Sequence, residues 1–482
     1  MKDFKYIWIF GLLFTGLIIL IPVVLALRPE AEAQDNPWAT VKDDPEHTSH
    51  ADLFDGPFTT GSEVTLACLD CHPNAAQQVM KTNHWTWQAP PATVSWSEEP
   101  VSTGKKNVLN NFCIGIQSNW PGCTKCHAGY GWDDAEFDFT VEANVDCLVC
   151  HDQSGIYAKG TSGLPAEGVD LLAVAESVGL PTRENCGGCH FNGGGGNAVK
   201  HGDMDTSLYF PSEEQDVHMG RFDFECTDCH QTHDHEISGR AISVSVDNSN
   251  QVYCTDCHDA AIIHDDSRIA AHLDSVACQT CHVPAGATRE PTKVYWDWST
   301  AGQDIAENTH EYLKIKGSFI YESDIMPEYT WYNGVLASRY LLGDVIDPTQ
   351  PTVMNMPAGD IRDPEAKIFP FKIHYAKQIY DTVNNYLIQP QTVGEGGYWD
   401  VFDWDQAAQL GMDAVGLDYS GEYGFAETEM YWTLSHMVVP ADQALQCADC
   451  HSDNGRMDWP ALGYYGDPMR WGGRTSQVLV EK

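Results

Sequence analysis

Basic residues are scarce in this chain of 482 residues. It has 27 lysines and arginines against 69 aspartates and glutamates, which gives a formal net charge of −42. Such a chain repels phosphate backbones, and this argues strongly against nucleic acid as a binding partner. The surplus of acid is typical of a soluble, self-repelling surface, and it would also steer a basic redox partner toward the protein.

Spare cysteines are also almost absent. Sixteen of the 17 cysteines fall in C-x-x-C-H motifs, and only Cys113 lies outside them. The eight motifs are Cys68–Cys71–His72, Cys123–Cys126–His127, Cys147–Cys150–His151, Cys186–Cys189–His190, Cys226–Cys229–His230, Cys254–Cys257–His258, Cys278–Cys281–His282 and Cys447–Cys450–His451.

This motif is typical of covalent attachment of a c-type haem. Two residues between the cysteines place both sulfurs on one face of a helical turn. There they form thioethers with one porphyrin, and the adjacent histidine becomes the first axial ligand of the iron. Zinc sites built from C-x-x-C pairs do not require a histidine after every second cysteine. We therefore expect eight covalently bound c-type haems as the cofactors.

Eight haems would form much of the core, and 41 glycines and 25 prolines favour short helices joined by many loops. We predict a mainly α fold with extensive loops and a few short strands, in the manner of a multihaem cytochrome c built around a stack of eight haems. The patterns predict helices over 167–179, 400–415 and 426–437, and strand-like runs within 312–321. The expected regions are a signal peptide or N-terminal membrane anchor (1–33), a haem-dense region with seven motifs (34–290), a haem-free, aromatic-rich covering region (291–440), and the eighth motif with a C-terminal tail (441–482).

The N-terminus is typical of an export signal. Lys2 and Lys5 precede an apolar run over residues 6–27, and Ala31-Glu-Ala33 offers a cleavage position after Ala33. The run is also nearly long enough to span a bilayer. Both alternatives, a cleaved signal and a retained anchor, place the haem-binding part outside the cytoplasm, in the periplasm or an equivalent compartment.

Second axial ligands must come from elsewhere in the chain. A second histidine makes an electron-transfer haem, whereas an open position lets the iron bind a substrate. Twelve histidines lie outside the motifs, so their number does not separate an electron wire from an enzyme. His233 and His235 follow His230 too closely to reach around the same haem, and cross-ligation to a neighbouring haem is expected. Cys113 is interpreted as a small buried hydrophobe, or else as a polarizable group near the second haem.

Several unusual runs resemble the octahaem tetrathionate reductase family, which belongs with the multihaem nitrite reductases and hydroxylamine oxidoreductases. They include Val79-Met-Lys-Thr-Asn-His84-Trp-Thr-Trp, Asn110-Asn-Phe-Cys113, His127-Ala-Gly-Tyr-Gly-Trp, His190-Phe-Asn-Gly-Gly-Gly-Gly, Val199-Lys-His201-Gly-Asp-Met-Asp, Trp296-Asp-Trp-Ser-Thr-Ala-Gly and Glu427-Thr-Glu-Met-Tyr-Trp. The resemblance covers about residues 50–459.

The resemblance implies one catalytic haem, on Cys123–His127, and seven relay haems with two histidine ligands each. The second ligands or neighbouring histidines that it implies are His50, His84, His201, His218, His235, His264, His272 and His436. The family associates a lysine with the catalytic iron, which we place just after Gly-Tyr-Gly-Trp. Asp133 stands there, and no lysine follows before Lys159. We therefore predict that His127 holds this iron and that its other face is open or water-bound. The alternative is that Lys105, Lys106 or a spare histidine caps that face.

Two functions remain open at this point. The first is multi-electron reduction of tetrathionate, nitrite or hydroxylamine at one haem, fed through the others by a redox partner protein or a quinol-linked donor. Its candidate catalytic residues are His127, as the ligand of the iron, and Lys105, Lys106, Tyr130 and Asp133, as proton donors or stabilisers of an oxyanion. The alternative is a non-catalytic electron carrier in which all eight haems are six-coordinate.

Overall fold

The computed structural model describes residues 11–12, 14–16, 36, 38, 40–41 and 44–478. The chain divides into two compact units, residues 1–41 with 253–271 and residues 42–252 with 272–482. The first unit contains the sixth motif, in which a 3₁₀ turn spans Cys254–Asp256, and the short helix α10 (Ser267–Ala270). Asp266 caps α10 by accepting a hydrogen bond from the backbone N–H of Arg268.

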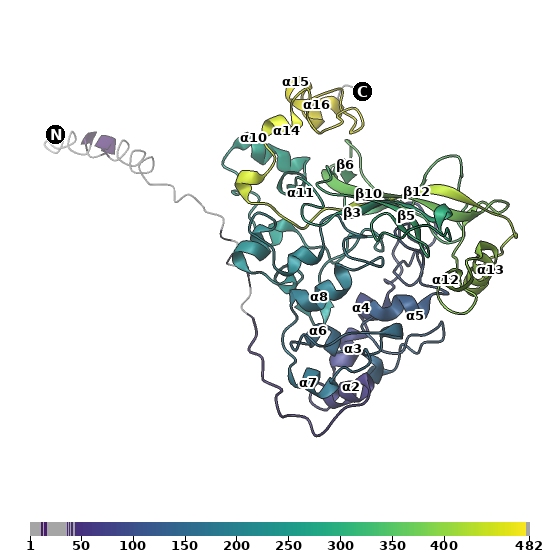
Figure 1. Cartoon of the computed structure of the whole chain (residues 1–482). Helices are drawn as coiled ribbons and strands as arrows, with labels where there is room; N and C mark the ends of the chain where they lie inside the picture. The colour runs from purple at the N-terminus through teal and green to yellow at the C-terminus, as the bar shows by residue number, and fades with distance from the viewer. Residues whose placement is uncertain are drawn as a thin grey trace. The chain divides into compact units, whose positions relative to one another are not determined.

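The N-terminal half of the second unit is built from short helices and loops, as Figure 1 shows in purple and teal. Its helices are α2 (Gly61–Leu69), α3 (Ala75–Val79), α4 (Asn83–Thr86), α5 (Trp120–Cys123), α6 (Leu148–His151), α7 (Leu171–Glu176), α8 (Arg183–His190), a π-helix (Val217–Arg221), α9 (Cys226–Cys229) and α11 (Cys278–His282). The helix predicted over 167–179 exists as α7, which is shorter because Asp170 caps it at Ala173 N and it ends before Ser177.

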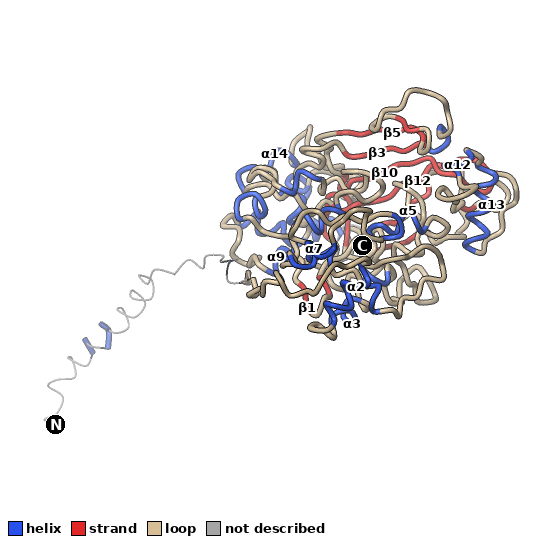
Figure 2. The backbone as a smooth tube through the Cα atoms, turned by 60° about the horizontal axis from the view of Figure 1, so that its bottom comes forward, coloured by secondary structure: helices blue, strands red, loops and turns tan. Residues whose placement is uncertain are grey.

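A mixed sheet follows the helical part, and Figure 2 shows its strands in red. Its strands are β3 (Thr292–Asp297), β4 (Tyr312–Leu313), β5 (Gly317–Glu322), β6 (Glu328–Tyr332), β8 (Thr352–Val353), β10 (Lys367–Asp381), β11 (Tyr386–Leu387) and β12 (Tyr423–Thr433). The strand order is β4-β5-β3-β10-β12-β8, and β6 and β11 also pair with β10. Two smaller ladders join β1 (Thr232–His233) to β2 (Glu236–Ile237) and β7 (Leu336–Arg339) to β9 (Asn355–Pro357).

Helices pack on one end of this sheet. The helix predicted over 400–415 is present as α12 (Tyr398–Val401) and α13 (Trp404–Val415), separated by Phe402 in the left-handed conformation. Buried Trp404 and Met412 of α13 pack in one core cluster with Trp296 of β3 and Phe319 of β5. The chain ends with α14 (Cys447–Cys450), α15 (Pro468–Trp471) and α16 (Arg474–Val478).

The helix predicted over 426–437 is wrong, because this stretch forms strand β12. Ala426, Thr428, Met430 and Trp432 are buried, while the residues between them are more exposed. That alternation has a period of two residues, which is typical of a strand. Pairing with β10 along eleven residues, from Phe371↔Thr433 to Asp381↔Tyr423, therefore outweighs the helical propensity of this stretch. The strand-like runs predicted within 312–321 are confirmed as β4 and β5.

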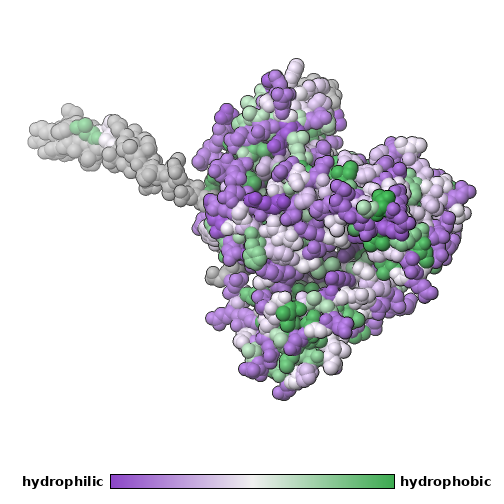
Figure 3. All heavy atoms as spheres, in the orientation of Figure 1, coloured by the Kyte–Doolittle hydropathy of each residue, from purple (hydrophilic) through white to green (hydrophobic). Residues whose placement is uncertain are grey.

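Short helices and loops joined to a sheet confirm the predicted fold class, although β10, with 15 residues, is longer than the short strands expected. Among the described residues, no helix is long and apolar enough to cross a membrane. The apolar run over 6–27 lies outside the described residues except for positions 11, 12 and 14–16, and so does the cleavage position at Ala33. Hydrophilic residues cover most of the face of the protein in Figure 3, in keeping with the acidic composition.

Candidate functional site

Most of the C-x-x-C-H motifs form a single helical turn, as their spacing predicts. Backbone N–H groups of His72, His151, His230, His258 and His451 donate to the carbonyl oxygen of the first cysteine in their own motifs, at 2.8–3.2 Å. The fourth and seventh motifs lie at the ends of α8 and α11. In each of these motifs the two thiols therefore lie near one face of one turn.

Histidines from distant parts of the chain face five of the motif histidines. The distances between ring centres are 6.2 Å for His50 and His72, 6.1 Å for His84 and His190, 6.5 Å for His151 and His235, 6.2 Å for His230 and His436, and 6.0 Å for His272 and His451. Each pair joins a motif histidine to one of the second ligands that the family resemblance implies.

This spacing fits a haem iron between two imidazoles. A metal–imidazole bond is about 2 Å long, and the nitrogen lies about 1 Å from its ring centre, so two imidazoles on opposite sides of one metal have centres about 6 Å apart. The rings are also oriented for ligation. Nδ1 of His151 and of His230 bonds the carbonyl oxygens of Gly179 and Ser238, and Nδ1 of His451 bonds Asp467 at 2.6 Å. Each ring thus keeps Nε2 for a metal, as ligating histidines do.

Burial keeps four of these imidazoles in the form that binds metals, whereas the contact with Asp203 raises the pKa of His436. Desolvation lowers the pKa of His84, His151 and His230, and it lowers the pKa of His190 to about 3. These four rings are therefore neutral at physiological pH, with a lone pair available for iron.

Three further histidines were predicted beside haems. His264 lies six residues beyond His258, in the same compact unit. His218 follows Val217, whose backbone N–H donates to the carbonyl oxygen of Val438. The backbone N–H of Val439, the residue after Val438, donates to the carbonyl oxygen of His282. His201 is placed differently, because its ring packs against Trp432 at 5.0 Å. The roles of these three residues stay predictions.

Neighbouring motifs touch one another through their thiols. The sulfur of Cys68 lies beside that of Cys147, the sulfur of Cys126 beside that of Cys189, and the sulfur of Cys186 beside that of Cys226. These contacts join the first motif to the third, the second to the fourth and the fourth to the fifth. Cys281 of the seventh motif and Cys447 of the eighth also lie close enough for their charges to interact. Motifs in contact bring their haems close together, as electron transfer requires.

The second motif differs from the others at its histidine. The backbone N–H of His127 donates to Thr124 rather than to Cys123, and His127 itself is extended, with φ −73° and ψ 141°. Its Nε2 lies 2.6 Å from the carbonyl oxygen of Trp85, and its buried Nδ1 has no partner. Nε2, the nitrogen that the other motif histidines keep for iron, is therefore bonded to a backbone carbonyl group here. That His127 is an iron ligand stays a prediction.

No second histidine ring faces His127 in the described part of the chain. Its ring instead contacts the aromatic side chains of Trp85, Trp87, Trp132, Phe137 and Phe139, at centre distances of 4.8–6.1 Å. Gly129 allows this packing, because a Cβ there would lie 2.7 Å from the Trp85 ring and 2.8 Å from the His127 ring. The second motif thus lacks the histidine pair that marks five of the others.

A buried network lies directly beneath this motif. Lys159 Nζ donates to the carbonyl oxygens of His127 (2.6 Å) and Gly129 (3.1 Å) and forms an ion pair with Asp146 at 2.6 Å. Asp146 also accepts hydrogen bonds from Tyr130 Oη and Tyr157 Oη, both at 2.8 Å. Burial and the charge of Asp146 raise the pKa of Tyr130 well above its ordinary value, so this phenol holds Asp146 and is a poor proton donor.

The structure places two of the other predicted catalytic residues near His127 and leaves a third exposed. Lys105 Nζ lies 4.1 Å from the centre of the Trp87 ring, and Lys106 Nζ lies 4.3 Å from that of Phe139, so both belong to the surroundings of His127. Asp133 is exposed, and its carboxylate accepts a hydrogen bond from Ser162 Oγ. Sequence reasoning missed Lys200, whose charge, like those of Lys105 and Lys159, acts on the thiol of Cys126.

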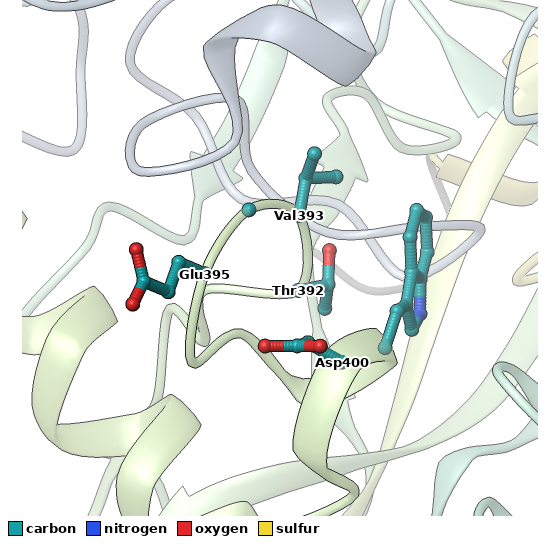
Figure 4. Close-up of a pocket in the computed structure, with 6 residues that line it drawn as sticks. Thr392, Val393, Glu395 and Asp400 are labelled. Carbon is teal, nitrogen blue, oxygen red and sulfur yellow. The ribbon is translucent and has the colours of Figure 1, made fainter.

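A cavity of about 510 Å³ opens near the start of the second motif. It is lined by Thr392, Val393, Gly394, Glu395, Trp399 and Asp400, and Figure 4 shows Thr392, Val393 and Glu395 on one loop, with Asp400 on a helix. Asn119, just before α5, holds this loop by accepting a hydrogen bond from Thr392 N at 2.6 Å. The two carboxylates give the cavity an acidic lining, which disfavours anions.

Eight attachment motifs and five facing histidine pairs define a multihaem c-type cytochrome. A family model for cytochrome c554 and c-prime matches residues 67–152, and one for bacterial cytochrome c matches residues 293–454. No protein among the curated sequences matches.

A solved structure, the octahaem cytochrome c from Shewanella oneidensis, is 49% identical to this chain. The match has a TM-score of 0.83 and covers 88% of this chain and 98% of the other. The chain therefore belongs to the octahaem cytochrome c family, and its cofactors are covalently bound c-type haems. This confirms the predicted cofactors and the resemblance drawn from the sequence.

Proposed function

We propose that this protein is an exported reductase that transfers several electrons to a small nitrogen or sulfur compound, namely nitrite, hydroxylamine or tetrathionate. The reaction takes place at the haem of Cys123 and Cys126. The observation that carries this proposal is that, within the described residues, the second motif has no facing pair of histidine rings, whereas at five other motifs a second imidazole lies 6.0–6.5 Å away. When bound at the second motif, the haem supplies electrons and an iron position for the substrate.

The side chains around the motif support an anionic substrate. Lys105 and Lys200 both act electrostatically on the sulfur of Cys126, although the whole chain carries a net charge of −42. Fixed cations in a site shielded from water stabilise negative charge on a bound oxyanion and on the transition state. Lys106 is the best placed proton donor of the predicted set, because burial lowers its pKa.

Two side chains are candidates for the axial ligand that the protein supplies to this iron. His127 is a candidate because it belongs to the motif, and Lys159 because the fold brings it close to the motif. We propose Lys159, because its Nζ lies against the backbone of His127 and Gly129 while Nε2 of His127 is engaged by Trp85. The lysine that the family associates with the catalytic iron would then be Lys159, and Asp133 would be no obstacle to the family's activity. Asp146 would orient the amine through its contact with Nζ.

The remaining seven haems would act as relays, and a redox partner protein or a quinol-linked donor would deliver electrons to them. We further propose that the mature protein lies outside the cytoplasm, because c-type haem motifs follow an N-terminal export signal. Whether residues 6–27 are cleaved off or remain as an anchor would be decided by the mass of the mature chain.

The function is tested by oxidation of reduced methyl viologen with nitrite, hydroxylamine or tetrathionate as acceptor. At least one should be turned over, and Lys105→Met should lower kcat/KM by about tenfold or more. Lys125→Met is the matched control, because Lys125 is an equally exposed lysine of the same motif, whereas Lys105 packs on the Trp87 ring that contacts His127; the control should leave the rate unchanged. An absence of turnover with all three, together with eight six-coordinate haems, would favour the electron carrier instead.

The iron ligand is tested by spectroscopy. Lys159→Leu should alter the electron paramagnetic resonance signal of one haem, whereas His127→Leu should leave it nearly unchanged. The opposite result would assign the iron to His127.

A further inference from the structure

A second cavity, of about 220 Å³, lies between the glycine-rich loop that follows α8 and the neighbouring strands β3 and β5. Figures 1 and 2 both show β3 and β5 side by side in the sheet. Its lining includes three basic side chains, Lys293, Lys316 and His310, against one carboxylate, Glu290. In a chain with 69 acidic and 27 basic residues, a cavity with more bases than acids is unusual.

Among these residues, Lys293 is the strongest evidence that the cavity favours an anion. Its side chain is 2% exposed, and its Nζ lies 3.5 Å from the centre of the Trp296 ring and 4.4 Å from that of Phe319. Among the described residues, no hydrogen bond or ion pair reaches this Nζ. Burial, and then the charge of Lys316, hold the pKa of Lys293 well below its ordinary range. A buried cation without a counter-ion is costly, so an anion entering the cavity would be stabilised.

The glycine-rich loop brings a second cation to the same cavity. Lys316 Nζ donates to the carbonyl oxygen of Gly195 at 3.4 Å, and a Cβ at Gly195 would lie only 2.9 Å from this Nζ. Gly195 also has a φ of +90°, which side chains disfavour. Glycine at this position therefore permits the close approach of Lys316.

The loop also reaches the surroundings of the second motif. A Cβ at Gly193 would lie 3.2 Å from Lys200 Nζ, and the Lys200 charge acts on Cys126. On the other side, Cys113 lies near both Lys293 and Cys123, since its charge affects the pKa of each of them. Cys113 and Lys200 are thus near both the cavity and the second motif.

The two cavities of the second unit differ in charge. The cavity of Figure 4 has two carboxylates, Glu395 and Asp400, and no basic residue in its lining. An anion would be repelled from that cavity and attracted to the one with Lys293.

We propose that the cavity lined by Lys293, Lys316 and His310 binds small inorganic anions and is the access route by which an oxyanion reaches the haem of Cys123 and Cys126. The access role rests on the proposed function, whereas anion binding does not depend on it. Lys293 provides a buried amine at the inner end, which takes up a proton from water when an anion enters, and Lys316 and His310 line the outer part.

Anion binding is tested with bromide, which has the charge of nitrite and can be located by anomalous X-ray diffraction. In crystals of the haem-loaded protein soaked in bromide, we expect a bromide peak next to Lys293 Nζ. The peak should be lost in Lys293→Met and retained in Lys314→Met, which makes the same substitution at a partly exposed lysine paired with Asp304. An empty cavity in the wild-type protein, or a peak that survives Lys293→Met, would overturn the proposal.

The access role is tested by the rates at which azide and carbon monoxide bind to the open haem. Azide is an anion and carbon monoxide is neutral, so Lys293→Met should slow azide binding by about tenfold and leave carbon monoxide binding unchanged. Lys316→Gln should slow azide binding in the same direction, and Lys314→Met should not.

Equal azide rates in wild type and Lys293→Met would overturn the access role. If neither ligand binds to any haem, the proposed function fails instead, and the bromide result still decides whether the cavity is an anion site.

Discussion

Lys372 is a buried cation whose effect on stability can be worked out from its surroundings. It lies on β10, is 2% exposed, and its Nζ donates to the carbonyl oxygens of Val199 and Lys200 and to Thr292 Oγ1, at 2.5–3.2 Å. Burial lowers the pKa of Lys372 from 10.5 to about 7, against a weaker opposing effect of Asp203. Between these two pH values the unfolded chain binds a proton that the folded chain lacks.

Stability therefore rises with pH in this window, because the unfolded state holds more protons. A full proton of difference is worth about 1.4 kcal/mol per pH unit, which gives about 2 kcal/mol between pH 7.5 and 9.5. Lys372→Met should remove this contribution. The free energy of unfolding should then rise with pH by about 2 kcal/mol less in the variant than in the wild type.

The measurement is guanidinium unfolding of both proteins at the two pH values, followed through haem absorbance. Other titrating groups cancel in the double difference as long as they act independently. Lys377→Met, at a half-exposed position of the same strand, is the control and should leave the pH dependence unchanged. A double difference below about 0.5 kcal/mol for Lys372→Met would refute the reasoning, since that is the usual error of additivity.

Three further outcomes are expected. The mass of the mature protein should correspond to eight covalent haems, and seven or fewer would contradict the reading of the motifs. His235→Leu removes the imidazole that faces His151 at 6.5 Å and should create one additional haem that binds carbon monoxide, whereas His233→Leu, at a fully exposed neighbour, should not. Phe371→Ala empties a fully buried site on β10 and should cost about 3–5 kcal/mol, whereas Phe210→Ala, at an 83% exposed position, should cost about 0.5 kcal/mol or less; similar losses for the two would contradict the placement of β10 in the core.

The motifs were readable from the sequence because C-x-x-C-H is a local pattern, and one helical turn satisfies it wherever it occurs. The histidine pairs were not readable in this way. His50 lies near its motif in sequence, but His436 faces His230 across more than two hundred residues, and only the fold brings them together. Strand β12 was predicted as a helix, because its pairing with β10 joins residues about fifty positions apart and cannot be read from the local pattern.

Lys159, near the second motif, could not be identified from the sequence for a different reason. Lys159 lies 32 residues from His127 along the chain, yet its Nζ is 2.6 Å from the carbonyl oxygen of that residue. Searching next to Gly-Tyr-Gly-Trp led to Asp133, which the structure places at the surface. Asp146 was the sign in the sequence of a buried lysine, because an acid directly before the third motif can hold a buried cation. The spacing of residues, however, does not identify Lys159 as its partner.

The central claim is that one haem of eight, that of Cys123 and Cys126, has a face open to substrate. Titration of the fully reduced protein with carbon monoxide tests it most directly, since this neutral ligand binds a ferrous haem only where the second axial position is free or displaceable. The account predicts one carbon monoxide per protein, accompanied by one high-spin ferric signal before reduction. No binding, or binding at two or more haems, would contradict it.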